Sequence, residues 1–354
     1  MRNFKASCRC FSILALLLCL MVAGNNTRRV NAQGDSAVFS DSTSLPAGEG
    51  HGFDIANMDR SAAACQNFFQ YANGGWTKSN PVPAAYSRWG RFDELSEKNR
   101  DVVHQILEDA AKNQSAAKGS NEQKVGDYYA ACMDEARVEA DGLKPIQAEL
   151  DRIGKVKDQQ ALQADVAHLH GLNIPVLFRF GSGQDFKDAT QVIGQLNQGG
   201  LSLPDRDYYV NPDEKSKTIR AKYVAHVARM FQLLGDDATA AGNEANAVMS
   251  IETKLAEASM KREDLRVPEA RYHKMKVADL KALAPEFGWD AYFKGIGVNF
   301  ADLNVGMPDF VKAESKLLTA TSLDDWKTYL RWHLVNSRAA ALPKKFVDED
   351  FDFR

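Results

Sequence analysis

The sequence has 354 residues, of which 44% are hydrophobic and 26% are charged, and its formal net charge is −3. This length allows one large domain or two smaller ones, and the composition is ordinary for a globular protein. A charge so close to balance gives no reason to expect nucleic acid or an anionic membrane surface as a partner.

The start of the chain has the pattern of an export signal. Basic residues that include Arg2 and Arg9 precede an apolar run of about 13 residues, and Val30-Asn31-Ala32 fits a signal-peptidase site. The run is shorter than the roughly 20 apolar residues that a membrane span needs. We therefore expect residues 1–32 to be removed and the protein to be exported to a periplasm or the extracellular space. The alternative is an uncleaved signal that anchors the chain in a membrane.

Cysteine usage changes when the signal is removed. The chain has five cysteines, and only Cys65 and Cys132 lie after residue 32. Two cysteines in an oxidising compartment usually pair. The bridge would close a loop of about 67 residues, which is worth on the order of 4 kcal/mol by chain-entropy arithmetic. The sequence thus favours a Cys65–Cys132 disulfide, with two free buried thiols as the alternative.

The rest of the chain predicts a short lead and then helices. Residues 33–60 are rich in Gly, Ser, Asp and Ala without a sustained period, which predicts a flexible lead segment. From Ser61 onward the apolar spacing is mostly helical, and Gly235 is placed to end one of the helices. The stripes that predict buried helix faces are Val102, Val103, Ile106 and Leu107; Tyr223, Val227, Met230, Phe231 and Leu234; Val248, Met249, Ile251 and Leu255; and Trp326, Tyr329, Leu330 and His333.

One region has the pattern of strands instead. The apolar run Pro175–Phe180 ends at Gly181-Ser182-Gly183, and the β-prone run Thr190–Leu196 ends at Gly199-Gly200. No internal repeat is visible, which argues against a solenoid. The predicted fold class is therefore mainly α, a large multi-helix domain with a small β-hairpin insertion.

A complete catalytic site is missing from the sequence. A zinc hydrolase of the helical type needs two His four residues apart with Glu beside the first, because both imidazoles must face the metal. The chain has no H-E-x-x-H, and His168 and His170, two residues apart, would point to different faces of a helix. It also lacks the G-x-S-x-G elbow, the phosphate-binding loop and the dinucleotide motif G-x-G-x-x-G. We predict no catalytic residue, no metal ligand and no cofactor in this chain.

Short patterns near the amino-terminal end of the helical region predict further local structure and one possible binding residue. Asn73–Trp76 predicts a turn followed by an aromatic anchor, and Asn80–Pro83 predicts an extended stretch, because each proline biases its predecessor away from the helix. The next run contains Arg88. Its guanidinium could pair in a bidentate way with a carboxylate, either a peptide terminus or a structural Asp or Glu.

Several motifs together resemble the neprilysin family of zinc metallopeptidases, in its bacterial type. They follow the family order from about Ser61 to the end of the chain. They are Cys65–Trp76 (CQNFFQYANGGW), Pro81–Pro83, Ser87–Leu95 (SRWGRFDEL), Tyr128–Asp134 (YYAACMD) and Gly199–Tyr209 (GGLSLPDRDYY).

The resemblance implies an exported or membrane-anchored metalloendopeptidase that cuts small peptides. In this family a helical amino-terminal domain caps a thermolysin-like zinc domain. Residues 61–354 would then be an incomplete amino-terminal domain, and the catalytic zinc domain would lie beyond it. The implied partners are small peptide substrates and the chain's own carboxy-terminal zinc domain, with no nucleic acid and no membrane beyond the signal segment. The alternative is a truncated, non-catalytic helical protein that binds peptides.

The resemblance also implies a substrate site. Arg88 matches the arginine that holds the carboxylate of a short peptide, and Phe92 and Asp93 match its neighbours in the same subsite. Their implied role is positioning and specificity, since peptide hydrolysis itself needs a metal-activated water. In animal relatives the matches of Cys65 and Cys132 pair with cysteines further along the chain, so the Cys65–Cys132 pairing rests on count and compartment alone.

Overall fold

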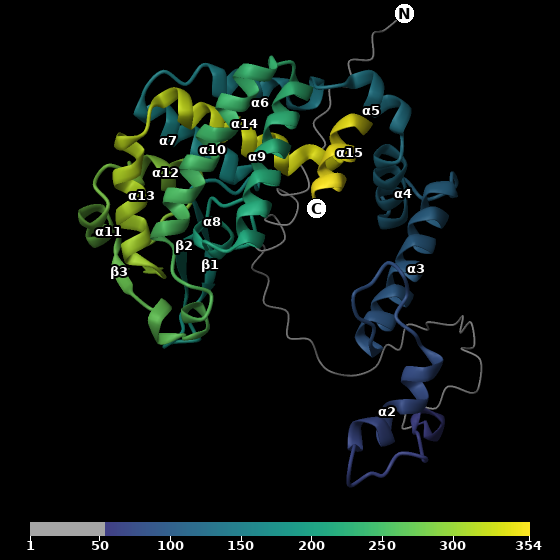
Figure 1. Ribbon diagram of the computed structural model, residues 1–354. Helices are drawn as coiled ribbons and strands as arrows, with labels where there is room; N and C mark the ends of the chain where they lie inside the picture. Colours follow the sequence, from purple (N-terminus) through teal and green to yellow (C-terminus); the bar gives the residue numbers. More distant parts are fainter. Residues whose placement is uncertain (1–53) are drawn as a thin grey trace, which may run out of the picture. The chain divides into compact units, whose positions relative to one another are not determined.

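The computed structural model describes residues 54–354, and the predicted export signal and most of the predicted lead segment lie outside the described residues. Helices dominate, as the sequence predicts (Figure 1). The chain divides into two compact units, and the boundary between Lys98 and Asn99 falls inside one long helix. Within residues 54–354, no helix is both long and apolar enough to cross a membrane.

The first unit contains the 3₁₀ turn η1 (Ile55–Asn57), helix α2 (Phe68–Ser79) and the start of α3 (Arg91–Lys112). Two glycines let η1 and the residues after it approach α2. A Cβ at Gly75 would clash with the carbonyl oxygen of Ala56, and one at Gly74 with the side chain of Asp59. The predicted turn at residues 73–76 is therefore wrong, since these glycines lie within α2 and serve close backbone packing.

The second unit holds the rest of α3 and most of the helices. Gly235 ends α9 with φ of 113°, as the sequence predicts. The further helices and turns are α4 (Asn121–Cys132), α5 (Glu135–Asp141), α6 (Lys144–Gly154), α7 (Gln159–Gly171), α8 (Asp207–Val210), α9 (Glu214–Leu234), α10 (Ala238–Ala258), η2 (Asp264–Arg266), η3 (Glu269–Arg271), α11 (Val277–Leu283), α12 (Trp289–Gly295), α13 (Pro308–Ala320), α14 (Leu323–Arg338), η4 (Ala339–Ala341) and α15 (Lys344–Phe353).

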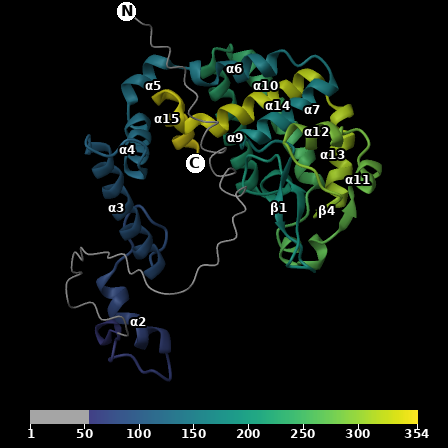
Figure 2. The ribbon, with the colours of Figure 1, turned by 180° about the vertical axis from the view of Figure 1, so that it is seen from behind.

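A small sheet lies among these helices (Figure 2). The predicted hairpin is confirmed as the antiparallel pair β1 (Phe178–Gln184) and β2 (Val192–Gln198), although β1 continues through the glycines where the sequence predicts its end. The sequence does not predict the other two strands. β4 (Asp302–Val305) pairs parallel with β2, and β3 (Lys274–Lys276) pairs antiparallel with β4, so the order is β1-β2-β4-β3.

The two faces of the sheet differ in chemistry. Strand residues alternate between faces, and directly paired residues share one. One face packs on the aromatic and aliphatic core through Phe178, Phe180, Leu196, Leu303 and Val305. The register places a more polar set on the other face, where Ile193 is the apolar exception: Arg179, Gly181, Gly183, Ile193, Gln195, Asn197 and Asn304.

Burial confirms most of the predicted helix stripes but not all of them. The apolar residues of the stripes on α9, α10 and α14 lie in or against the two buried clusters of the second unit, and His333 of the α14 stripe is buried as well. Helix α3 is confirmed as a helix, yet Val102, Val103 and Ile106 are 59%, 53% and 57% exposed. Helical periodicity identifies an apolar face, but it does not say what covers that face.

The Gly199–Tyr209 segment folds around a buried carboxylate, that of Glu252 in α10. Glu252 accepts hydrogen bonds from the hydroxyl groups of Ser202 (2.7 Å), Tyr209 (2.6 Å) and Tyr223 (2.7 Å). The Tyr209 oxygen in turn accepts the backbone N–H groups of residues 202 and 203. Burial and the neighbouring carboxylate raise the pKa of Tyr209 well above 10, so it stays a donor.

Glu314 of α13 is a second buried carboxyl, but neither of its oxygens has a hydrogen-bond partner among the described residues. Burial raises the pKa of Glu314 to about 8. A carboxyl group in this setting is mostly protonated at neutral pH, because the charged form would be both desolvated and unpaired.

We predict that Glu314→Gln changes how stability depends on pH. The folded-state pKa of Glu314, about 8, lies above the ordinary 4.5, so the folded state holds a proton that the unfolded state releases between these values. The native chain should therefore lose stability relative to the variant as pH rises from about 4.5 to 8, by on the order of a few kcal/mol. Urea unfolding at several pH values measures the difference. The control is Glu257→Gln at an exposed site on α10, and a difference that does not vary with pH would contradict the prediction.

Candidate functional site

The residues predicted to contact substrate lie in the first unit. Arg88 is exposed in the segment between α2 and α3, and Phe92 and Asp93 lie in the first turn of α3. The Phe92 side chain is 89% exposed. Among the described residues, Arg88 has no ion-pair or hydrogen-bond partner, so its guanidinium is free to meet a ligand.

Arg91, which the sequence analysis did not single out, has the structural role in this turn. It pairs with Glu94 at 2.9 Å, donates to the Asn57 side chain at 3.1 Å and stacks over the Trp76 ring. The two arginines of the S-R-W-G-R run therefore differ: Arg91 is tied to its own unit, and Arg88 is not. Only two residues lie between these arginines, and their contacts alone reveal the difference.

The predicted disulfide stays a prediction. Cys65 and Cys132 are exposed and free in this structure, and they belong to different units. The alternative of two buried thiols does not match their exposure. Non-reducing peptide mapping would decide whether they pair.

The histidines of α7 are structural. His168 bonds to Glu149 at 2.7 Å, and His170 lies between the Tyr292 hydroxyl and the Val176 carbonyl at 2.7 and 2.9 Å. Burial lowers the pKa of His170, which favours its neutral form. Within residues 54–354 no group of three or more His, Cys, Asp and Glu side chains is placed to hold a metal ion.

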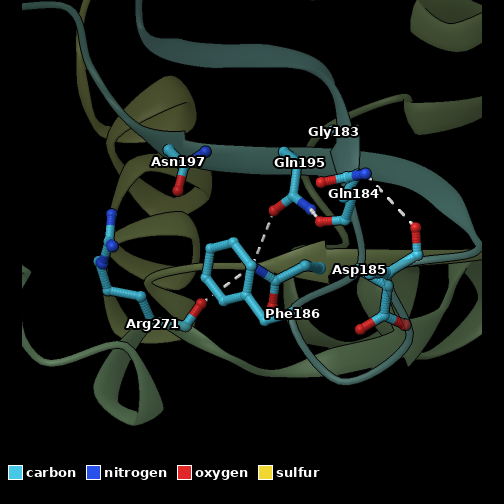
Figure 3. A pocket seen from close by; sticks show the side chains of 9 residues that line it. Gly183, Gln184, Asp185, Phe186, Gln195, Asn197 and Arg271 are labelled. Carbon is cyan, nitrogen blue, oxygen red and sulfur yellow. Dashed lines mark hydrogen bonds between the residues drawn. The ribbon is translucent and has the colours of Figure 1, made fainter.

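A second candidate site lies on the polar face of the sheet in the second unit (Figure 3). It is a hollow of about 500 Å³ between the β1–β2 hairpin and the segment that contains η3. The residues that line it are Gly183, Gln184, Asp185, Phe186, Ala189, Gln195, Asn197, Arg271 and Asn304.

The floor of this hollow is fixed by buried Asn304. Its amide nitrogen donates to the Gln195 side chain and to the Arg271 carbonyl, both at 2.9 Å, while its oxygen accepts the His273 backbone N–H at 2.7 Å. These bonds tie β4 to β2 and to the chain after η3. They also position the backbone of Arg271 at the rim.

One wall is fixed by Asp185, at the end of the hairpin strand β1. Its carboxylate accepts the Lys274 ammonium and the Tyr272 hydroxyl, each at 2.8 Å, and the Lys187 backbone N–H at 2.9 Å. The Lys274 ammonium is the largest of the effects that lower the pKa of Asp185 to about 2. Asp185 is thus ionised and already neutralised within the wall.

Two side chains at the hollow have unused hydrogen-bonding capacity. The Arg271 Nε is buried without a partner, and no described carboxylate pairs with its guanidinium, which lies 5.9 Å from the centre of the Phe186 ring. The Asn197 amide likewise makes no hydrogen bond to another described residue. In Figure 3 the Arg271 side chain extends toward the part of β2 that carries Asn197. The sequence does not predict this site, because its residues come from the β1–β2 hairpin, from η3 and from β4, a strand that the sequence does not predict either. The alternation Gln195-Leu196-Asn197 in β2 is a short signal of a polar face, which Ile193 interrupts.

Comparisons with known proteins agree with this fold. Residues 64–354 match the amino-terminal domain of peptidase family M13. The chain belongs to peptidase family M13. It is similar to endothelin-converting enzyme 1 of Rattus norvegicus (32% identity over 84% of this chain and 40% of the relative). It is also similar to neprilysin-3 of Drosophila melanogaster (30% identity over 83% of this chain and 43% of the relative).

A solved structure supports the same relationship. The zinc metalloprotease Zmp1 of Mycobacterium tuberculosis, in complex with an inhibitor, matches with a TM-score of 0.78 and 30% identity over 85% of this chain. The match covers 46% of the Zmp1 chain. This M13 chain therefore spans less than half the length of the relatives named here.

We predict that Asp185→Asn destabilises the M13 chain in a pH-dependent way. The folded-state pKa of Asp185, about 2, is below the ordinary 3.8, so its contribution is fully present above about pH 4 and is lost as pH falls through about 2. The variant should melt at a lower temperature than the native chain at pH 7, and the gap should shrink toward pH 2. Thermal unfolding followed by circular dichroism measures it. Asp290→Asn, at an exposed ion pair with Lys281, is the control, and equal melting temperatures at pH 7 would refute the role of Asp185.

Proposed function

We propose that this chain is the amino-terminal, substrate-enclosing part of an exported zinc metalloendopeptidase that hydrolyses small peptides. The observation that carries the proposal is the M13 match over residues 64–354, together with 30% identity and a TM-score of 0.78 to a zinc metalloprotease. Export is supported by the basic and apolar pattern of residues 1–32.

The zinc ion is proposed to belong to another part of such an enzyme. The described residues do not fit a zinc site, because they contain no cluster of metal-ligating side chains. Relatives named above extend to more than twice the matched length. We therefore assign no chemical step to this chain and propose that a carboxy-terminal domain supplies the metal.

Exposed apolar side chains support a partner domain. In the second unit, Val102, Val103 and Ile106 form an exposed apolar face on α3. In the first unit, Phe68, Phe69 and Phe92 are also mostly exposed. Large apolar side chains exposed close together are typical of faces that another domain or a ligand covers. The proposed partner is the enzyme's own zinc domain, and the proposed ligand is a small peptide.

Arg88, Phe92 and Asp93 are proposed to bind the peptide. The free guanidinium of Arg88 can form a bidentate pair with a carboxylate, and the exposed Phe92 ring offers an apolar contact nearby. Asp93 is proposed to line the same subsite. Their role is to position substrate, because none of them is a nucleophile with an activating base.

We predict no peptide hydrolysis by the isolated chain. Zinc and a short fluorogenic peptide are added to the purified protein, and bound zinc is measured after dialysis. We expect no turnover and no stoichiometric zinc, because the described residues provide no metal site. Chelator-sensitive cleavage with one tightly bound zinc per chain would overturn the proposal.

Sequencing the coding DNA past Arg354 separates the proposed peptidase from the alternative of a non-catalytic binding protein, since only the peptidase requires H-E-x-x-H.

We predict that Arg88→Gln weakens the binding of a short peptide with a free carboxyl terminus. Loss of a charge-assisted hydrogen bond should weaken affinity by about tenfold or more. Fluorescence polarisation with a labelled peptide measures it. Arg60→Gln removes the same charge from an exposed site of the first unit and should have no effect. Equal losses in both variants would mean that Arg88 acts only through net charge.

A further inference from the structure

The polar face of the sheet is open because of glycines on β1. A Cβ at Gly181 would have no neighbour within 4 Å, and one at Gly183 would only touch the Gln195 side chain. Any larger residue at these positions would project into the hollow, since both lie on its face of the sheet. The strand thus presents its backbone there, beside the amide side chains of β2.

Arg271 gives this hollow its charge. Arginine is always protonated in proteins, and a guanidinium nitrogen removed from water without a partner is costly. Nε of Arg271 is in this state, and Asp185, the carboxylate in the lining, already accepts hydrogen bonds from Lys274 and Tyr272. The guanidinium as a whole has no carboxylate partner among the described residues, and the strongest acceptor for its other N–H groups is a carboxylate.

The rest of the lining suits a peptide better than a free anion. A volume of about 500 Å³ greatly exceeds what one carboxylate fills. The unused amide of Asn197 can both donate and accept, which matches the N–H and C=O groups of a peptide backbone. Phe186 adds an exposed aromatic surface at the rim.

We propose that this hollow is a second peptide-binding site, in which Arg271 pairs with the side-chain carboxylate of an extended acidic peptide and Asn197 bonds to its backbone. The inference rests on the proposed function, because it takes peptides as the ligands of this chain. It adds a specificity for acidic residues in the bound peptide, and a site whose lining residues all belong to the second unit.

The test is an NMR titration of the full chain with capped peptides. The probe is the pentapeptide acetyl-Ala-Ala-Asp-Ala-Ala-amide, and the comparison arms are the same peptide with Asn in place of Asp and sodium acetate. The observed signals are the Nε–H of Arg271 and the side-chain amide of Asn197. We expect the Asp peptide to shift both, with affinity about tenfold or more above that of the Asn peptide.

Variants show which residues are responsible for peptide binding and for the preference for Asp over Asn. Arg271→Gln should abolish the preference for Asp over Asn, and Asn197→Ala should weaken both peptides while it keeps the preference. Arg266→Gln removes the same charge from an exposed position of the neighbouring turn η2 and should behave as the native chain. Thermal unfolding of each variant shows that the fold is retained.

Three outcomes would overturn the inference: an unchanged preference in Arg271→Gln, equal affinity for the two peptides, or binding of acetate as tight as that of the Asp peptide. Arg88→Gln makes this failure distinguishable from failure of the proposed function. If peptide binding depends on Arg88 and not on Arg271, the second site is wrong and the proposed function stands. If the Arg271 response persists in Arg88→Gln, the second site is supported by itself.

Discussion

The buried carboxylate of Glu252 is the constraint on which the second unit depends. A desolvated carboxylate is tolerated only when its oxygens are saturated with donors. Ser202, Tyr209 and Tyr223 supply them, and Ser202 also accepts the indole N–H of Trp332 at 2.9 Å. One group on α10 therefore joins the segment before α8, helix α9 and helix α14. Removal of any single donor would leave this buried group with fewer hydrogen bonds, which is costly away from water.

A second set of hydrogen bonds joins helix α14 to the base of the β1–β2 hairpin. The Tyr329 hydroxyl of α14 donates to the Gly200 carbonyl at 2.9 Å and accepts the Leu177 backbone N–H at 3.0 Å. Gly200 has φ of 75°, and a Cβ there would clash with Tyr329 and Leu177, so no other residue fits. The two bonded groups lie immediately before β1 and shortly after β2. The base of the hairpin is thus fixed, and with it the polar face that carries the hollow.

The sequence predicts what depends on local periodicity and misses what depends on long-range pairing. The stripes of α9, α10 and α14 and the β1–β2 hairpin follow from spacing within one element. The turn predicted at Gly74-Gly75 is wrong because these glycines allow η1 and the residues after it to approach α2. That contact cannot be inferred from the local sequence pattern. The sequence does not predict β4, because a strand of four residues whose partners β2 and β3 lie elsewhere in the chain leaves almost no periodic signal. Arg88 lies in a family motif and could therefore be predicted as a binding residue, whereas Arg271 lies in none of these motifs.

Arg88 and Arg271 are both proposed to bind peptide, but the physical evidence for each of them differs. An exposed, unpaired arginine is ordinary, since water satisfies it, and structure alone would not single out Arg88; the family resemblance does. Arg331, by contrast, shows what a structural arginine looks like, with Asp236 at 2.6 Å and Glu244 at 2.8 Å. Arg271 fits neither case, because its Nε is shielded from water and still lacks a protein acceptor. Its guanidinium also lines an open polar hollow, where the other N–H groups can meet the carboxylate of a ligand.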